Sequence, residues 1–160
     1  MKKTLLIAAI MLVLISLTGC DMIEKIIPLK NATVGDKANS DNPTREGADI
    51  TLISSSATAL TVKIENNTDS TWQSGNMRDY HLEALKGGEW YTVNQIGEFA
   101  NTMELMIFAP GENMTHTFEF SERYGKLADG KYRVVKSFWA NATPTTEAHE
   151  FHLICEFTVE

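Results

Sequence analysis

The sequence predicts an all-β protein, an antiparallel sandwich of about seven or eight strands that follows a signal peptide and a flexible linker. Two observations predict this fold. Apolar and polar residues alternate with a period of two from residue 48 onward, and turn-forming residues separate the runs. No stretch shows the spacing of an amphipathic helix. A domain of this size buries roughly two-thirds of its unfolded surface, so it needs no disulfides to fold.

The first element is an expected export signal over residues 1–19. Two lysines precede an almost wholly apolar run over residues 4–17, which is shorter than the roughly twenty residues of a membrane span. The run ends in Leu17-Thr18-Gly19-Cys20. This tetrapeptide resembles the lipobox of bacterial lipoproteins, which implies cleavage after Gly19 and a diacylglycerol on the Cys20 sulfur. The alternative is an ordinary cleaved signal that leaves Cys20 as a free thiol.

The resemblance to lipoproteins implies a location outside the cytoplasm, on the surface of a bacterial membrane. One acyl chain holds a protein only marginally, whereas two or three chains on one cysteine hold it firmly. Residues 20–47 are expected to be the lipidated N-terminus and a flexible tether. Residues 31–47 are rich in Asn, Asp, Gly and Thr, with Val34 among few apolar side chains. Such a segment buries too little apolar surface to offset its chain entropy.

The domain is expected over residues 48–160, and its first half is predicted from alternating runs. The run from Ile50 to Leu52 opens it. A hairpin turn is predicted at Gly87-Gly88, because glycines readily adopt the positive φ angles of two-residue turns. The alternating positions are Leu60, Val62 and Ile64 in one run, Tyr80, Leu82 and Ala84 against His81 and Glu83 in the next, and Glu89 to Val93 after the turn.

The second half continues the same pattern to the end of the chain. A turn at residues 109–112 separates two of its runs, because Pro110 and Gly111 favour a reversal. The last run is the clearest strand, because five alternate residues in it are apolar. The alternating positions are Met103, Leu105 and Ile107, then Met114 to Phe120, then Tyr132, Val134 and Phe138, and finally Phe151, Leu153, Cys155, Phe157 and Val159.

The segment Gly130-Lys131-Tyr132 resembles the turn and strand start of immunoglobulin-like (Ig-like) folds. There a tyrosine bonds back to the backbone as a tyrosine corner, which implies that role for Tyr132. A wider set of segments resembles bacterial Ig-like domains, and the likeness covers residues 48–160. It implies an Ig-like sandwich in the cell envelope and no defined activity. The segments are Glu65-Asn-Asn-Thr68, Tyr80-His-Leu-Glu83, Gly88-Glu-Trp90, Pro110-Gly-Glu112, Tyr124-Gly-Lys-Leu127 and Gly130 to Lys136.

Composition and motifs exclude several functions. The whole chain has a formal charge of −7, and the domain carries 16 acidic and 8 basic residues. Nucleic-acid binding is therefore not expected, because it needs a basic surface. The sequence has no Gly-x-Ser-x-Gly, no His-Glu-x-x-His and no glycine-rich phosphate loop. We predict a protein that is not an enzyme and that uses no cofactor.

Three aromatic residues are the candidate binding residues. In an Ig-like sandwich, loops from different strands gather at one end. Trp72, Phe99 and Trp139 lie on or beside the loops expected at residues 66–77, 94–102 and 140–147. Aromatic side chains on loops suit recognition of proteins or sugars. The alternative is that Trp72 and Trp139 close the end of the core.

Two other groups of residues favour structural roles. Cys155 falls on the core face of the last strand, where a cysteine behaves as a small inert apolar residue. Glu147, His149, Glu150 and His152 suggest a metal site, but an odd spacing places the two histidines on opposite faces of a strand. Glu150 and His152 share a face, and two ligands do not close a site.

The sequence therefore predicts a non-enzymatic, lipid-anchored envelope protein whose domain is a binding or interaction module. The expected partners are membrane lipid at Cys20 and an envelope protein or cell-wall glycan. Three alternatives remain open: a protease inhibitor that presents the loop beginning at Ala140, a metal-binding lipoprotein, and an accessory subunit of an envelope complex.

Overall fold

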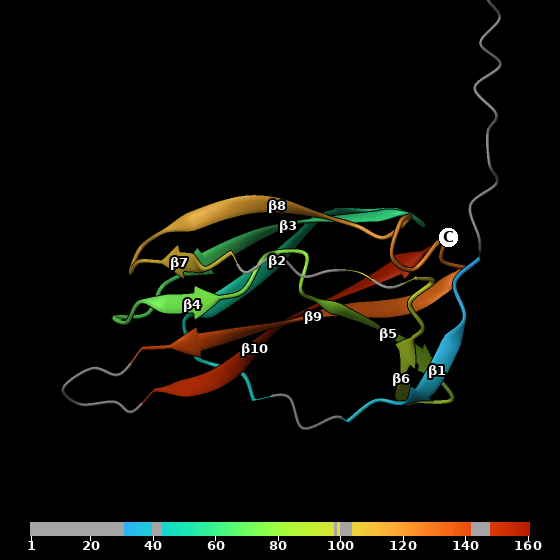
Figure 1. The fold of residues 1–160 in the computed structure, drawn as a ribbon, viewed down its shortest axis with the longest axis horizontal. Helices are drawn as coiled ribbons and strands as arrows, with labels where there is room; N and C mark the ends of the chain where they lie inside the picture. The colour runs from blue at the N-terminus through green and yellow to red at the C-terminus, as the bar shows by residue number, and fades with distance from the viewer. Residues whose placement is uncertain (1–30, 40–42, 98, 100–103, 142–147) are drawn as a thin grey trace, which may run out of the picture.

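The computed structural model describes residues 31–39, 43–97, 99, 104–141 and 148–160. These residues form two packed antiparallel sheets, as predicted (Figure 1). None of them forms a helix long and apolar enough to cross a membrane. The strands are β1 (Val34–Lys37), β2 (Ala48–Ser55), β3 (Ala59–Asn66), β4 (Trp72–Ser74), β5 (His81–Lys86), β6 (Glu89–Val93), β7 (Met106–Phe108), β8 (Asn113–Glu119), β9 (Gly130–Ala140) and β10 (His149–Val159).

The smaller sheet has the strand order β2-β3-β8 and forms the upper layer of Figure 1. Its central strand β3 alternates as predicted, with Leu60, Val62 and Ile64 fully buried against the other sheet. On the opposite side of this sheet, the hydroxyls of Thr61 and Thr117 lie 3.0 Å apart across β3 and β8. The period-two pattern therefore sets both the strand and the face that it buries.

The larger sheet has the order β1-β6-β5-β9-β4-β7, with β10 paired to the other side of β9. The pairing of β9 with β10 runs from Gly130 opposite Val159 to Ala140 opposite His149. The other side of β9 is shared by β5 and then β4. The apolar alternation predicted for the last strand is confirmed. Its buried residues are Phe151, Leu153, Cys155, Phe157 and Val159.

Aromatic rings fill the space between the two sheets. Trp72 meets Phe138 and Phe151 edge to face, with ring centroids 5.8 and 5.1 Å away. Tyr80 meets Phe118 in the same way at 4.8 Å. Truncating a ring packed like this to alanine typically costs about 3–5 kcal/mol of stability. The contact of Tyr80, next to β5, with Phe118 on β8 joins the two layers.

Both predicted turns are present. Gly87 and Gly88 have φ angles of 59° and 86°, and they connect β5 to β6 as a tight hairpin. Gly111, in the turn before β8, has a φ angle of 78°. A side chain at any of these positions would meet the steric penalty that disfavours positive φ.

The expected tether contains a strand, so that prediction is wrong for part of it. β1 pairs with the edge strand β6, with Val34 opposite Val93 and Lys37 opposite Tyr91. On either side of β1, Asn94 N–H donates to the Thr33 carbonyl at 2.8 Å and Ala38 N–H donates to the Trp90 carbonyl at 2.9 Å. Composition did not predict this because edge pairing uses backbone groups and requires few apolar side chains.

The number and phase of the strands also differ from prediction. Ten strands form within the described residues, since β1 and the three-residue β4 add to those expected. In the run before β8, Phe108 faces the core, whereas Leu105 and Ile107 are exposed. The expected alternation began at Met103, which lies outside the described residues. Both faces of this run are therefore apolar. The face with Phe108 is the buried one, because Phe108 pairs with Trp72 and stacks on its ring.

Candidate interaction face

Trp72 is not available to a partner, which corrects its prediction as a binding residue. The side chain is fully buried. The reason is local: Trp72 begins β4 and pairs with Phe108 on one side and Ala140 on the other. Its ring therefore points between the sheets, and its indole N–H donates to the Thr68 hydroxyl at 3.1 Å. The expected alternative, in which Trp72 closes the core, holds.

Trp139 lies on the opposite side of the same sheet, the outer face that points away from the other layer. Its neighbour Phe138 is buried, and alternation turns Trp139 outward. The strand register places Gln73 directly beside Trp139 and Ile107 beside Gln73. Glu150 lies beside Trp139 on β10. Four strands thus contribute one continuous row of side chains to this outer face.

Two members of this row, Ile107 and Trp139 on either side of Gln73, are apolar and open. Trp139 is 52% exposed, Ile107 is 57% exposed and Leu105 is 63% exposed. Leu105 precedes Ile107 by two positions, the spacing that returns to the same face of an extended chain. We call Gln73, Leu105, Ile107 and Trp139 the open face. Contiguous exposed apolar side chains on a folded domain mark interaction sites, whereas single ones do not.

The other half of the same outer face is polar and closed. Glu83 lies on the side of β5 opposite Leu82 and Ala84, yet it is almost fully buried. Arg133 Nε donates to Glu83 Oε2 at 2.6 Å, and His81 Nε2 lies 3.0 Å from Glu83 Oε1. The Arg133 guanidinium lies 4.3 Å from the centre of the Trp90 ring. We call His81, Glu83, Trp90 and Arg133 the ionic cluster.

Electrostatics keep the ionic cluster charged. Burial alone would raise the pKa of Glu83, but hydrogen bonds from His81 and Arg133 outweigh this effect and hold the pKa below its ordinary value. The carboxylate therefore balances the buried guanidinium. Sequence reasoning missed this cluster because Glu83 and Arg133 are far apart in the chain and meet only through the register of β5 and β9.

The predicted tyrosine corner is formed at the start of β9. The Tyr132 hydroxyl donates to the Ala128 carbonyl at 2.9 Å, across the turn that leads into the strand. Gly130 opens β9 two residues earlier. This is the arrangement that the resemblance to Ig-like folds implies.

Comparison with known families agrees with the fold. A family model described as a bacterial Ig-like domain matches residues 45–152. The chain belongs to the bacterial Ig-like domain family. Comparisons with curated proteins and with solved structures gave no match. Domains of this family are typically non-catalytic, and membership indicates a non-enzymatic interaction module.

Phe99 lies on a different surface of the Ig-like domain from Trp139. It is 39% exposed and borders a cavity of about 470 Å³ beside β8. The Arg123 guanidinium carbon lies 5.5 Å from the centre of its ring. Trp139 is not part of this cavity lining. The structure therefore separates the three predicted aromatic residues into one core residue and two surface sites.

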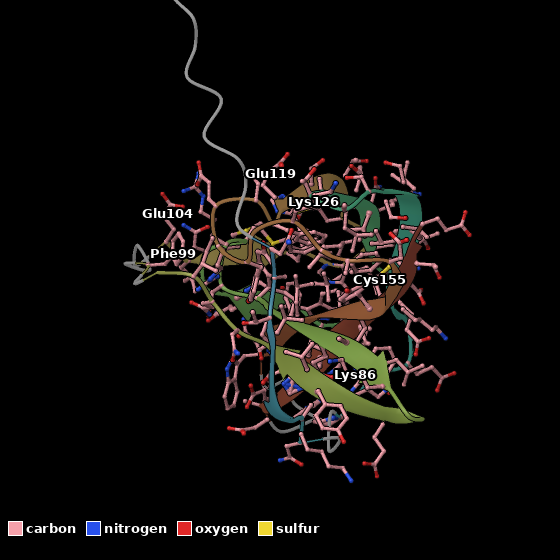
Figure 2. All side chains as sticks on the ribbon, turned by 90° about the vertical axis from the view of Figure 1, so that its right-hand side faces the viewer. Lys86, Phe99, Glu104, Glu119, Lys126 and Cys155 are labelled. Atoms are coloured by element: carbon pink, nitrogen blue, oxygen red, sulfur yellow. The ribbon has the colours of Figure 1, made fainter. Side chains whose placement is uncertain are left out.

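The cysteine and histidine predictions are resolved in different ways. Cys155 lies buried between the layers, as predicted (Figure 2), and burial raises the pKa of its thiol to about 11. Within the described residues, no three His, Cys, Asp or Glu side chains gather closely enough to hold a metal ion. Glu150 and His152 do share a face, 3.7 Å apart. Glu147 and most of the loop after Ala140 lie outside the described residues.

Proposed function

We propose that the chain is a lipid-anchored protein of the bacterial cell envelope whose Ig-like domain binds a protein partner through the open face. The observation that carries the binding proposal is the row of exposed apolar side chains around Trp139. These side chains come from separate strands, so their placement is fixed by the sheet and not by a loop. Binding sites on rigid elements need little ordering when a partner arrives.

The charges around the open face indicate the chemistry of the partner. Glu104 is exposed next to Leu105, and Glu150 is exposed next to Trp139. The domain as a whole carries 16 acidic and 8 basic residues. A complementary surface has an apolar centre and a basic rim. A second copy of this chain would bring like charges together, so we propose a different protein as the partner.

The aliphatic members of the open face favour a protein over a glycan. A sugar stacks on an aromatic ring, but its hydroxyl groups also need polar side chains nearby. Ile107 and Leu105 offer no hydrogen bonds, and Gln73 is the one polar member of the open face. Apolar side chains of a partner protein would cover these residues without leaving hydroxyl groups unsatisfied.

The anchor is supported by the sequence at the start of the chain. The apolar run over residues 4–17 leads directly to the lipobox-like Leu17-Thr18-Gly19-Cys20. Metabolic labelling with a palmitate analogue tests this part. We expect label on the wild-type protein and on Cys155→Ser, and none on Cys20→Ser. Label that persists on Cys20→Ser would contradict the proposal.

Photo-crosslinking in intact cells tests the binding site. A photoreactive amino acid in place of Ile107 should give one discrete protein adduct, and the same amino acid in place of Lys63 on the other sheet should not. Adding Trp139→Asp should abolish the adduct, because central aromatic residues contribute at least about 2 kcal/mol to binding, or roughly 30-fold in affinity. An adduct that survives Trp139→Asp, or a glycan adduct alone, would overturn this site.

A further inference from the structure

The cavity beside β8 is a second candidate site, separate from the open face. It holds about 470 Å³, within the usual range of about 300–1,000 Å³ for sites that bind small molecules. In Figure 2, Phe99 and Glu104 lie on one side of the molecule, with Glu119 above them. The side chains around the cavity are Met77, Arg78, Tyr80, Phe99, His116 and Phe118, with Thr117, Glu119 and the turn residues Ser121, Glu122 and Arg123.

Arg123 is the buried charge in the lining. Its side chain donates through Nη1 to the backbone carbonyls of Arg78 and Tyr80. The guanidinium carbon also lies 5.6 Å from the centre of the Tyr80 ring and 5.5 Å from that of Phe99. Only 9% of Arg123 is exposed. Its Nε–H is buried and has no hydrogen-bond partner among the described residues.

A second cation lies close behind the cavity. Lys136, on the inner face of β9, is almost fully buried, and burial lowers its pKa to about 8. Burial holds the pKa of His116, one of the lining residues, below its ordinary value, and the charge of Lys136 lowers it further. Lys136 therefore keeps its charge in neutral solution and adds to the positive potential at this side of the core.

The carboxylates near the cavity are exposed, so they do not neutralise the buried cations. Glu119 and Glu122 are exposed at its rim, where water screens their charge, and Asp79 next to Lys136 is exposed as well. Among the described residues, Glu83 is the one buried carboxylate, and it is paired with Arg133 on the opposite side of the sheet. Buried charges act more strongly than solvated ones, which favours an anion beside Arg123.

We propose that this cavity binds a small organic anion, a single carboxylate on an apolar or aromatic frame. The carboxylate pairs with the guanidinium of Arg123 in the cavity lining, which offsets a charge that otherwise faces backbone carbonyls and aromatic rings. The apolar frame packs against Met77, Tyr80 and Phe118, with Phe99 at the entrance. A neutral His116 can donate one further hydrogen bond. This site is independent of the protein partner proposed above.

A series of probes matched in shape and different in charge tests the proposal. 3-Phenylpropionate, its neutral amide and 3-phenylpropylamine are titrated into the full chain in detergent, with hexanoate and its amide as an aliphatic pair. The readout is the NMR signal of the Met77 methyl group, assigned with Met77→Leu. We expect a saturable shift with at least one carboxylate, with at least tenfold weaker binding of its amide and of the amine. Equal binding of acid and amide, or no saturable shift with either acid, would overturn the proposal.

Variants locate the bound anion. Arg123→Gln should weaken carboxylate binding by tenfold or more and leave the weak amide binding unchanged. Because Arg123 also holds two backbone carbonyls, Phe99→Ala serves as a second variant that removes an exposed ring at the entrance. Phe99→Ala should lower the affinity for the carboxylate and for its amide by a similar factor. Trp139→Ala, on the open face, is the control and should change neither. Unchanged carboxylate affinity in a folded Arg123→Gln protein would contradict the site.

Discussion

On the outer face of the larger sheet, one half buries charged residues and the other half exposes apolar ones, the reverse of the usual distribution. At one end of the outer face, the ionic cluster buries Glu83 and Arg133. At the other end, the open face exposes Trp139 and Ile107. Figure 1 shows the strands of these halves at opposite ends of the molecule, with β1 and β6 at one end and β4 and β7 at the other. The comparison shows that the burial of a residue on this face depends on its neighbours and not on its own polarity.

The closed half has structural partners and the open half does not. Every member of the ionic cluster contacts another member, and β1 extends the sheet beside it. Within the described residues, the open face is made of neighbours in a sheet with no element over them. We therefore expect mutations in the closed half to change stability, and mutations in the open half to change binding.

The largest expected effect comes from breaking the ion pair of the closed half. Glu83→Leu leaves Arg133 buried without its carboxylate, which typically costs about 3–5 kcal/mol of unfolding free energy. Chemical denaturation of the full-length protein measures this loss. The double variant Glu83→Met with Arg133→Met removes both charges and should recover most of the stability. A Glu83→Leu protein as stable as the wild type would contradict the role of the pair.

Removing a buried charge that lacks an equally buried partner should stabilise the protein, in contrast to Glu83→Leu. Lys136→Met keeps the shape and removes the cation, so we expect a gain of about 3 kcal/mol at pH 7, the equivalent of a pKa lowered from 10.5 to about 8. The unfolded lysine retains its proton up to higher pH than the folded one. The penalty is therefore complete below pH 8 and is relieved as the pH rises toward 10.

Denaturation at pH 7 and at pH 9.5 measures both parts of this prediction. The advantage of Lys136→Met should shrink between the two values, because the wild type gains stability over that range. Lys63→Met is the matched control. Lys63 is half-exposed and its Nζ lies 2.7 Å from Glu65 Oε1, and ion pairs near the surface contribute about 1 kcal/mol or less. A constant advantage of Lys136→Met across this range would contradict the assigned penalty.

Detaching β1 should have a moderate and local effect. A Cβ atom at Gly35 would lie 2.8 Å from the Thr92 hydroxyl oxygen. Either the Thr92 and Asn94 side chains turn away or β1 shifts, so Gly35→Val should weaken the pairing of β1 with β6 at a cost of about 1–3 kcal/mol. Hydrogen exchange of the Asn94 amide, which donates to Thr33, should become fast. At Gly75, a Cβ would meet only ordinary contacts, so Gly75→Ala should leave this amide protected.

The sequence predicts the parts of the fold that depend on long alternating runs. β3 and β10 bury the residues expected of them, because one face of each is uniformly apolar. β4 is only three residues long, which is too short for alternation to show that Trp72 points inward. The burial of Glu83 depends on a distant partner, Arg133, and strand pairing between distant segments has no local signal.

The open face was partly readable from the sequence. Alternation from Tyr132 to Phe138 already places Trp139 on the opposite side of its strand. What the sequence does not show is that Ile107 lies on the same face. That neighbourhood exists because Gln73 pairs with Ile107 on one side and Trp139 on the other. A binding face assembled across strands therefore appears only with the register.

The smallest expected effect on stability belongs to the open face, and it completes the comparison. Trp139→Ser removes a side chain that is half exposed, so unfolding free energy should change by about 0.5 kcal/mol or less. Partner binding should fall roughly 30-fold or more. Phe138→Ala, one residue away on the buried side, should do the reverse and cost about 3–5 kcal/mol of stability. If Trp139→Ser instead destabilises the fold as strongly as Phe138→Ala, the ring is a structural cover for the sheet, and the open face loses its role as a binding surface.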